Sequence, residues 1–134
     1  MGRNILALTA GIITAVLIIF LLESVSASMF PMPAGLDPTN KDALAKHIAE
    51  LPLQAFLVIL SIYAIASFFG AFVATSISKT MRHAYIVAIV LIISNIANLA
   101  MIPHPLWFSI ASLLIYLPFA WLGGRMGTRT KSTN

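Results

Sequence analysis

Few side chains in this 134-residue chain could take part in chemistry, and the first of them is Glu23. It follows an apolar run that extends from Asn4 to Leu22 and holds no charged side chain. A carboxylate among apolar residues is unfavourable unless it is paired, hydrogen bonded or neutral, so it is a candidate for binding a cation or a proton. The alternative is a carboxylate that extends to the nearest polar surface or is only hydrogen bonded.

Further polar residues lie at helical spacing in equally apolar segments. Glu23 precedes Ser26 by three residues, a spacing that places both side chains on one side of a helix. Asn95 and Asn98 repeat this spacing in a later segment. We predict one polar binding cluster near one end of the helices, with hydrogen bonding between helices as the alternative role of its members: Glu23, Ser26, Tyr63, Asn95, Asn98, His104 and Tyr116.

His104 lies in a short connection rich in proline. Near Glu23, a protonated imidazole would form a pH-sensitive pair with the carboxylate, whereas an isolated loop histidine would be solvated. His47 and His83 lie on other segments, so no set of side chains has the spacing of a metal site. The sequence also contains no glycine-rich phosphate loop or nucleophile motif, and we predict neither a metal nor a cofactor.

The elements that must position these residues are four long apolar segments. Apolar residues make up 60% of the chain and charged residues 9%, with a mean hydropathy of +0.97, whereas soluble domains are near half apolar and a quarter charged. Segments of about 20 apolar residues span a bilayer, and without alternating polarity they do so as helices. We predict an all-α membrane protein, a single four-helix bundle over residues 1–134, with spans at about residues 4–28, 53–78, 84–102 and 106–124.

An outer insert at residues 34–51 joins the first two spans. Asp37 and Pro38 are typical of a helix start, because a capping acid is often followed by proline in the first turn. The apolar residues of the following turns share one face, which is typical of a helix lying on a membrane surface. We therefore predict a short interfacial helix that covers the bundle or docks a partner, with an apolar face of Leu44, Ile48 and Leu51.

The second half of the chain resembles the first. Residues 52–75 align with residues 105–128 without a gap, and the identical pairs include Pro52/Pro105, Tyr63/Tyr116, Gly70/Gly123 and Thr75/Thr128. Leu and Ile often match by chance in apolar segments, whereas shared proline, tyrosine and glycine are less easily explained in this way. We predict two parallel αα-hairpin repeats, related by an axis along the membrane normal.

Small residues recur every four positions in the second and fourth spans. Such stripes allow membrane helices to approach closely, either within one bundle or between two copies of a chain. Both uses remain open from the sequence. The predicted packing residues are Ala66, Gly70, Ala74, Ala120, Gly123, Gly124 and Gly127.

Lys and Arg are distributed unevenly between the two ends of the predicted spans. Most of them lie at the N-terminus, between the second and third spans and in the C-terminal tail, whereas Lys41 and Lys46 lie in the outer insert. By the positive-inside rule, both termini are cytoplasmic. The net charge of +4 is not gathered into an aromatic-studded patch, so we expect no nucleic-acid partner. The first apolar segment is longer than the core of a secretory signal, and we expect it to remain as the first span.

Three segments resemble small four-span bacterial membrane proteins that have no assigned activity: P-A-G-L-D-P at 33–38, L-P-L at 51–53 and N-L-A-M-I-P-H-P-L-W-F at 98–108. This resemblance implies a location in the bacterial inner membrane and supplies no activity. The chain is also similar to the small multidrug resistance transporters in having four helices and an acid in the first. Its acid lies later in the span and its outer insert is longer, so this second similarity is architectural.

Several functions follow from these features. The first expectation is an accessory or assembly subunit, or a regulator, that acts in the lipid bilayer through helix packing with another membrane protein or in a homo-oligomer. The alternative is a small proton- or ion-coupled transporter or channel with Glu23 as its coupling carboxylate. An intramembrane enzyme acting on lipid or quinone would need Glu23 and His104 within hydrogen-bond reach as an acid and base. We expect no enzymatic activity and predict no catalytic residue.

Overall fold

The computed structural model describes residues 1–130, and all regular structure in this part of the chain is helical. Four helices are long and apolar enough to cross a bilayer, as predicted for a membrane helical bundle. A fifth, short helix precedes the second long one. The helices are α1 (Gly2–Met29), α2 (Lys41–Ala49), α3 (Leu53–Ser78), α4 (Met81–Met101) and α5 (Leu106–Arg129).

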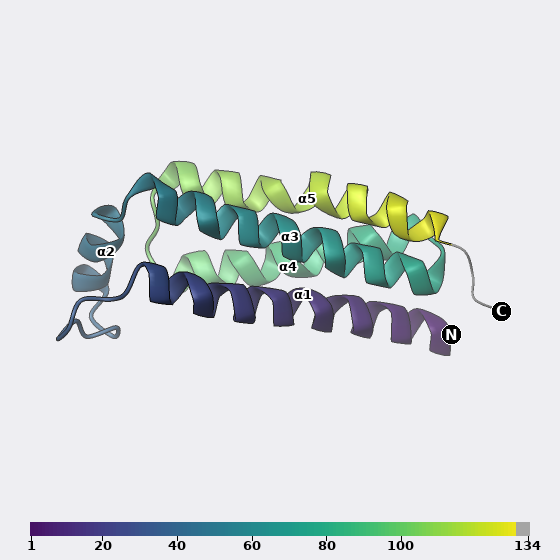
Figure 1. Cartoon of the computed structure of the whole chain (residues 1–134), viewed down its shortest axis with the longest axis horizontal. Helices are drawn as coiled ribbons and strands as arrows, with labels where there is room; N and C mark the ends of the chain where they lie inside the picture. The colour runs from purple at the N-terminus through teal and green to yellow at the C-terminus, as the bar shows by residue number, and fades with distance from the viewer. Residues whose placement is uncertain (131–134) are drawn as a thin grey trace.

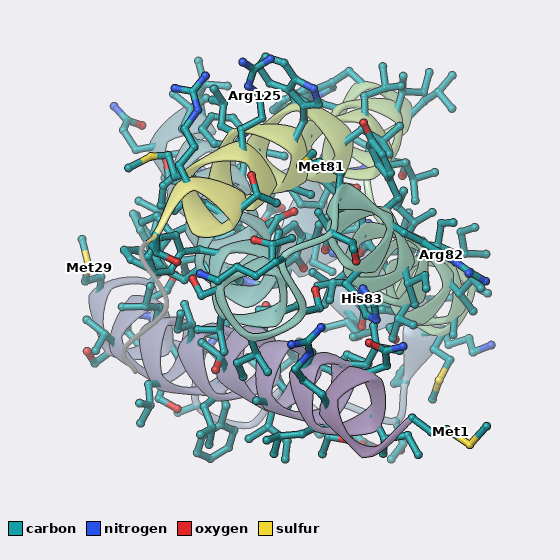
Figure 2. The ribbon with its side chains drawn as sticks, turned by 90° about the vertical axis from the view of Figure 1, so that its right-hand side faces the viewer. Met1, Met29, Met81, Arg82, His83 and Arg125 are labelled. Atoms are coloured by element: carbon teal, nitrogen blue, oxygen red, sulfur yellow. The ribbon has the colours of Figure 1, made fainter. Side chains whose placement is uncertain are left out.

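Helix α3 is the centre of the bundle (Figure 1). It packs along both α5 and α1, which do not contact each other, and it also contacts α4. The start of α1 and the end of α5 lie at one end of the bundle, and α2 lies across the other end. At the end that holds the start of α1, Arg82 and Arg125 point outward (Figure 2). The connections therefore alternate between the two ends, as expected for four consecutive spans.

Glycine determines how closely the long helices approach one another. A Cβ atom on Gly11 of α1 would lie 2.6 Å from the carbonyl oxygen of Gly70 in α3, and a Cβ on Gly70 would lie 2.9 Å from the Cβ of Ala15. In α5, a Cβ on Gly123 would overlap the backbone of Phe68. Side chains larger than hydrogen are therefore excluded at these crossings.

All the predicted small packing residues are buried within the single chain. The α5 glycines divide between two neighbours: Gly127 packs against Thr75 of α3, and a Cβ on Gly124 would lie 2.5 Å from the Cβ of Ala84 in α4. Of the two uses left open by the sequence, the structure shows packing inside the bundle. The buried set is Ala66, Gly70, Ala74, Ala120, Gly123, Gly124 and Gly127.

The short helix α2 begins later than the sequence pattern predicts. Its N-cap is Asn40, whose side-chain oxygen accepts hydrogen bonds from the backbone N–H groups of Asp42 and Ala43. Asp37 instead accepts from the backbone N–H and the hydroxyl of Thr39, at 2.9 and 2.7 Å, which forms a separate turn. Asn competes well with Asp as a cap, so the later cap residue sets the helix start.

The inner face of α2 packs on the end of the bundle. Leu44 and Ile48 are buried in the same apolar cluster as Phe56 of α3 and Phe108 of α5, and Leu51 packs against that cluster. The helix thus covers one end of the four long helices, and its interfacial position in a membrane remains a prediction.

The internal repeat also remains a prediction. Helices α3 and α5 begin directly after the matched residues Pro52 and Pro105, both of which have extended backbone. The surroundings of the two halves differ, however, because α3 contacts α4 whereas α1 and α5 do not touch. Gly70 accordingly packs against α1, whereas its counterpart Gly123 packs against α3.

Candidate functional site

A cavity of about 510 Å³ lies between the long helices, toward the end of the bundle that α2 covers. We call it the inner cavity. Each of the four long helices contributes to its wall, and apolar residues such as Ile19 and Leu91 form much of the lining. Its polar lining residues are Glu23, Tyr63, Ser94, Asn95, Asn98, His104 and Tyr116. The structure thus brings together every member of the predicted polar cluster except Ser26.

Glu23 enters the inner cavity from α1 and is partly buried. Helix α1 ends at Met29, six positions after Glu23, which corresponds to about 9 Å along a helix. The hydroxyl of Tyr63 interacts with the Glu23 carboxylate. Among residues 1–130, no cationic side chain contributes to its environment. The inner cavity therefore presents one carboxylate without a built-in counter-ion.

Two tyrosines form the wall opposite α1. The rings of Tyr63 and Tyr116 stack with centroids 5.5 Å apart and planes inclined by 25°. Both side chains are at least nine-tenths buried, at 5% and 2% exposure. Among residues 1–130, Ser76 Oγ is the only side-chain polar atom that is both fully buried and without a hydrogen-bond partner. Neither tyrosine hydroxyl is in that position. The stack therefore fixes both rings in place while the phenolic oxygens face the cavity that the two residues line.

The two asparagines of α4 differ in their bonding. Asn95 is buried, and its Nδ2 donates to Ser112 Oγ of α5 at 2.9 Å. Ser112 Oγ in turn donates to the Ser109 carbonyl oxygen at 2.9 Å. Asn98 is partly buried and has no side-chain hydrogen bond among residues 1–130. Asn95 therefore joins two helices, whereas the amide of Asn98 is free to meet a ligand in the inner cavity.

His104 lies at the α2 end of the inner cavity. It contacts the Ile102 carbonyl oxygen through Nδ1 at 2.8 Å and stacks on Phe108 with centroids 5.1 Å apart. A carbonyl oxygen can only accept, so Nδ1 carries the proton and donates, which leaves Nε2 as the acceptor of the neutral ring. Partial burial lowers the pKa of His104 below its ordinary value of 6.5, and the hydrogen bond to Ile102 opposes that shift. The structure thus shows His104 bonded to the backbone rather than paired with Glu23.

A second cavity of about 500 Å³ lies beneath α2, and we call it the outer chamber. Leu44, His47 and Ile48 of α2 line it on one side, and Phe56 of α3 lines it on the other. Three residues line both the outer chamber and the inner cavity: Ile59, Ile102 and His104. These shared residues form the partition between the two spaces.

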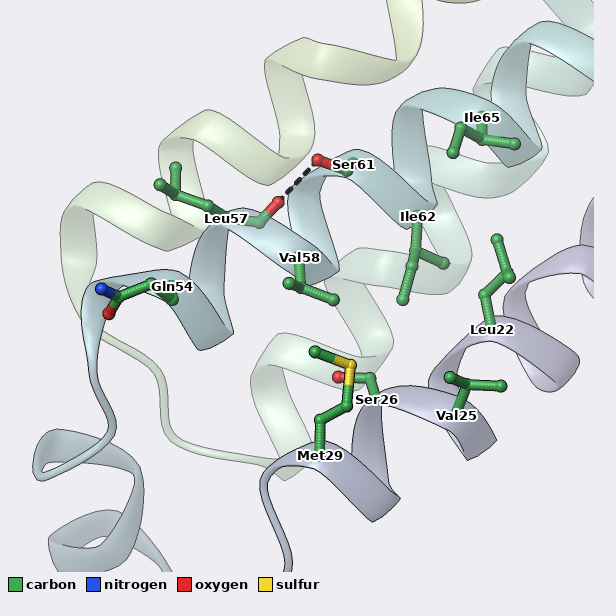
Figure 3. Close-up of a pocket in the computed structure, with 10 residues that line it drawn as sticks. All are labelled: Leu22, Val25, Ser26, Met29, Gln54, Leu57, Val58, Ser61, Ile62 and Ile65. Atoms are coloured by element: carbon green, nitrogen blue, oxygen red, sulfur yellow. Dashed lines mark hydrogen bonds between the residues drawn. The ribbon is translucent and has the colours of Figure 1, made fainter.

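Ser26 lies away from the inner cavity, in a side groove of about 440 Å³ between α1 and α3 (Figure 3). Residues three apart on a helix differ by about 60° in direction, and α3 lies between the two directions taken by Glu23 and Ser26. Ser26 consequently faces Val58 and Ile62 of α3 in this mostly apolar groove. It is therefore not part of the site around Glu23.

Two residues important to this arrangement were missed in the sequence. Ser112 lies one helical turn before Tyr116, so the same-face rule for residues four apart could have found it. Gly11 lies midway between Ala7 and Ala15, all three of which are buried, and repeats the four-residue spacing noted elsewhere. Among residues 1–130, no three side chains of His, Asp and Glu come together as a metal site would require.

Comparison with known proteins adds no assignment. No protein-family model, no curated protein and no solved structure matches the chain.

Proposed function

We propose that this protein is a small ion-coupled membrane transporter in which Glu23 exchanges a proton for a cationic solute. The observation that carries the proposal is the inner cavity, which places the only acid of the four long helices in a space of about 510 Å³. Intramembrane carboxylates that face a cavity commonly mark ion or substrate pathways.

The chemistry of the cavity suits alternating occupancy. When the carboxylate is protonated, the site is neutral and fits its apolar surroundings. When a cation enters, the proton leaves, and the carboxylate together with the phenolic and amide oxygens solvates the positive charge. The absence of a cationic partner for Glu23 among residues 1–130 supports this exchange, because a resident Lys or Arg would occupy the site permanently.

The packing of the small residues argues against the other expected role, that of an accessory subunit. Stripes of small residues on a free helix face would favour docking to another membrane protein. Here those stripes are buried inside the chain, as Gly70 against α1 and Gly123 against α3 illustrate. Docking would have to use the lipid-facing sides of the helices, which are apolar in any membrane protein.

We further propose that both termini are cytoplasmic in a bacterial inner membrane. The start of α1 and the end of α5 share one end of the bundle, and the connection between α3 and α4 lies at that end. The basic residues that favour this orientation are Arg3, Lys79, Arg82, Arg125 and Arg129. The α2 end and the outer chamber then face the outside.

The test is a flux assay on the full chain in liposomes, with an internal pH-sensitive dye. Outward gradients of Na⁺, K⁺ and a small quaternary ammonium ion are imposed in separate experiments. We expect one of these probes to drive proton entry with the wild-type protein and not with Glu23→Gln. Ser24→Ala is the matched control, since Ser24 is exposed and bonds only to the Phe20 carbonyl of its own helix.

A contrary result would be equal proton movement in the wild-type and Glu23→Gln proteins, or none with any probe. Native mass spectrometry of the untagged protein from its own membrane then becomes decisive. A stoichiometric second protein in that spectrum would support the accessory-subunit role, and a multimer of the chain alone would support homo-oligomerisation.

A further inference from the structure

We propose that His104 is the gate through which solutes pass between the outer chamber and the inner cavity, an inference that rests on the proposed function of Glu23. The two spaces are adjacent because they share Ile59, Ile102 and His104 as lining residues. Of these three, His104 alone has a polar ring. The route from the α2 end of the bundle to Glu23 therefore passes this side chain.

The backbone around His104 is held rigidly. Pro103 and Pro105 flank it, and each proline restricts both its own φ angle and the conformation of the preceding residue. Ile102 is accordingly extended, with φ −118° and ψ 121°. A rigid backbone leaves rotation of the His104 side chain as the movement that can open the partition.

The ring itself has one defined resting position. Its Nδ1 donates to the Ile102 carbonyl oxygen, and its face stacks on Phe108 at an angle of 21°. Phe108 is fully buried and packs in turn on Phe56, with centroids 5.3 Å apart. Rotation of the ring therefore breaks one hydrogen bond and one aromatic contact, and these two contacts hold the gate closed at rest.

The chemistry of the gate favours hydrated cations over apolar molecules. With Nδ1 committed to Ile102, the neutral ring presents the lone pair of Nε2, which can accept from water or from an ammonium group. In the outer chamber, His47 and Lys41 of α2 are the other titratable side chains. Glu23 is the carboxylate of the inner cavity, so a cation that passes His104 reaches the acid with which it exchanges a proton.

The chain contains no cysteine, which makes thiol labelling a direct test. A single cysteine at Ile19 reports on the inner cavity, because Ile19 lines it one helical turn from Glu23. A single cysteine at Thr39 reports on the outer chamber. The probe is a membrane-impermeant maleimide added outside sealed liposomes, and labelling at Thr39→Cys measures the fraction of chains whose α2 end faces the reagent.

We expect slow labelling of Ile19→Cys in the otherwise wild-type chain and labelling faster by about tenfold or more when His104→Ala removes the gate. His104→Phe keeps the stack on Phe108 and should leave the rate close to the original. His47→Ala is the matched control, because His47 lines the outer chamber and not the partition. Thr39→Cys should label at one rate in all four backgrounds.

Equal labelling of Ile19→Cys with and without the His104 ring would overturn the gate. So would acceleration by His47→Ala, which would indicate a general loosening of α2. The exposed residues Val16 and Phe20 also line the inner cavity, so entry between α1 and α4 would give labelling that is insensitive to His104. The two experiments fail independently. A negative labelling result rejects the gate but not transport through Glu23, whereas a negative Glu23→Gln flux result rejects the transport function but not the effect of His104 on labelling.

Discussion

Tyr63 and Tyr116 stack face to face across the centre of the bundle, one from each of the two helices that the internal alignment pairs. Both rings line the inner cavity, but the Tyr63 hydroxyl interacts with the Glu23 side chain directly, whereas Tyr116 interacts with its charge only at longer range. Tyr63 and Tyr116 therefore differ in how their hydroxyl groups can contribute to ligand binding at Glu23. This difference separates the role of the ring stack from that of the hydroxyl.

Tyr63→Phe should weaken binding of the transported cation while retaining the stack. The loss of a hydroxyl near a charged carboxylate corresponds to about 1.5–3 kcal/mol, or a rise in the half-saturating concentration of at least about tenfold. Tyr116→Phe is the matched control and should change this concentration far less. The measurement is the concentration dependence of cation-driven proton flux. Equal effects of the two substitutions would show that the hydroxyl of Tyr63 has no special role.

Asn95 and Asn98 should separate stability from binding. Asn95→Ala removes the hydrogen bond to Ser112 and is expected to lower the free energy of unfolding by about 0.6–1.7 kcal/mol, the range for contacts between membrane helices. Asn98→Ala removes no such bond, so its unfolding free energy should stay near the wild-type value while cation affinity falls. Unfolding in mixed micelles and the flux assay measure the two quantities. A stability loss confined to Asn98→Ala would contradict this assignment.

Gly123→Ala should destabilise the bundle strongly. The added Cβ would overlap the backbone of Phe68, so α3 and α5 would have to separate, at a cost of about 1–3 kcal/mol. Gly2→Ala is the matched control, because a Cβ at Gly2 meets nothing within 4 Å. The same mixed-micelle unfolding experiment compares the two. A Gly123→Ala protein as stable as the Gly2→Ala protein would show that α3 and α5 do not pack as closely as described.

Acidification should destabilise the folded protein through His104. Burial holds the folded-state pKa below the ordinary value of 6.5, so the folded protein binds fewer protons than the unfolded chain as pH falls past that value. The stability contribution is thus fully present above pH 6.5 and is lost as pH falls through the folded-state pKa. The measurement compares the thermal midpoints of two proteins across this pH range, one with His104 and one with His104→Phe.

Glu23 titrates in the same cavity, so both proteins in the His104 comparison should also carry Glu23→Gln. Removal of His104 is expected to flatten the acid side of the stability profile. An identical fall in stability in both proteins would show that the pH dependence does not come from His104.

The amino-acid sequence was sufficient to predict the four apolar helices, because length and composition alone decide whether a segment can span a bilayer. It was also sufficient to select most of the polar residues of the inner cavity, since Glu23, Asn95 and Asn98 are rare residue types in such segments. The start of α2 was misplaced because Asp37 and Asn40 are both good caps, and only their hydrogen bonds distinguish a turn from a helix start.

The tertiary structure decided which way each helix faces. Helices that are apolar on every side carry little pattern to show their orientation, so the position of Ser26 could not be assigned from spacing alone. Contact at Gly11 and Gly70 sets α1 against α3, and this turns Glu23 into the inner cavity and Ser26 into the side groove. The partition at His104 likewise exists only because α2 folds back over the bundle end, where long-range packing rather than local sequence encloses the outer chamber.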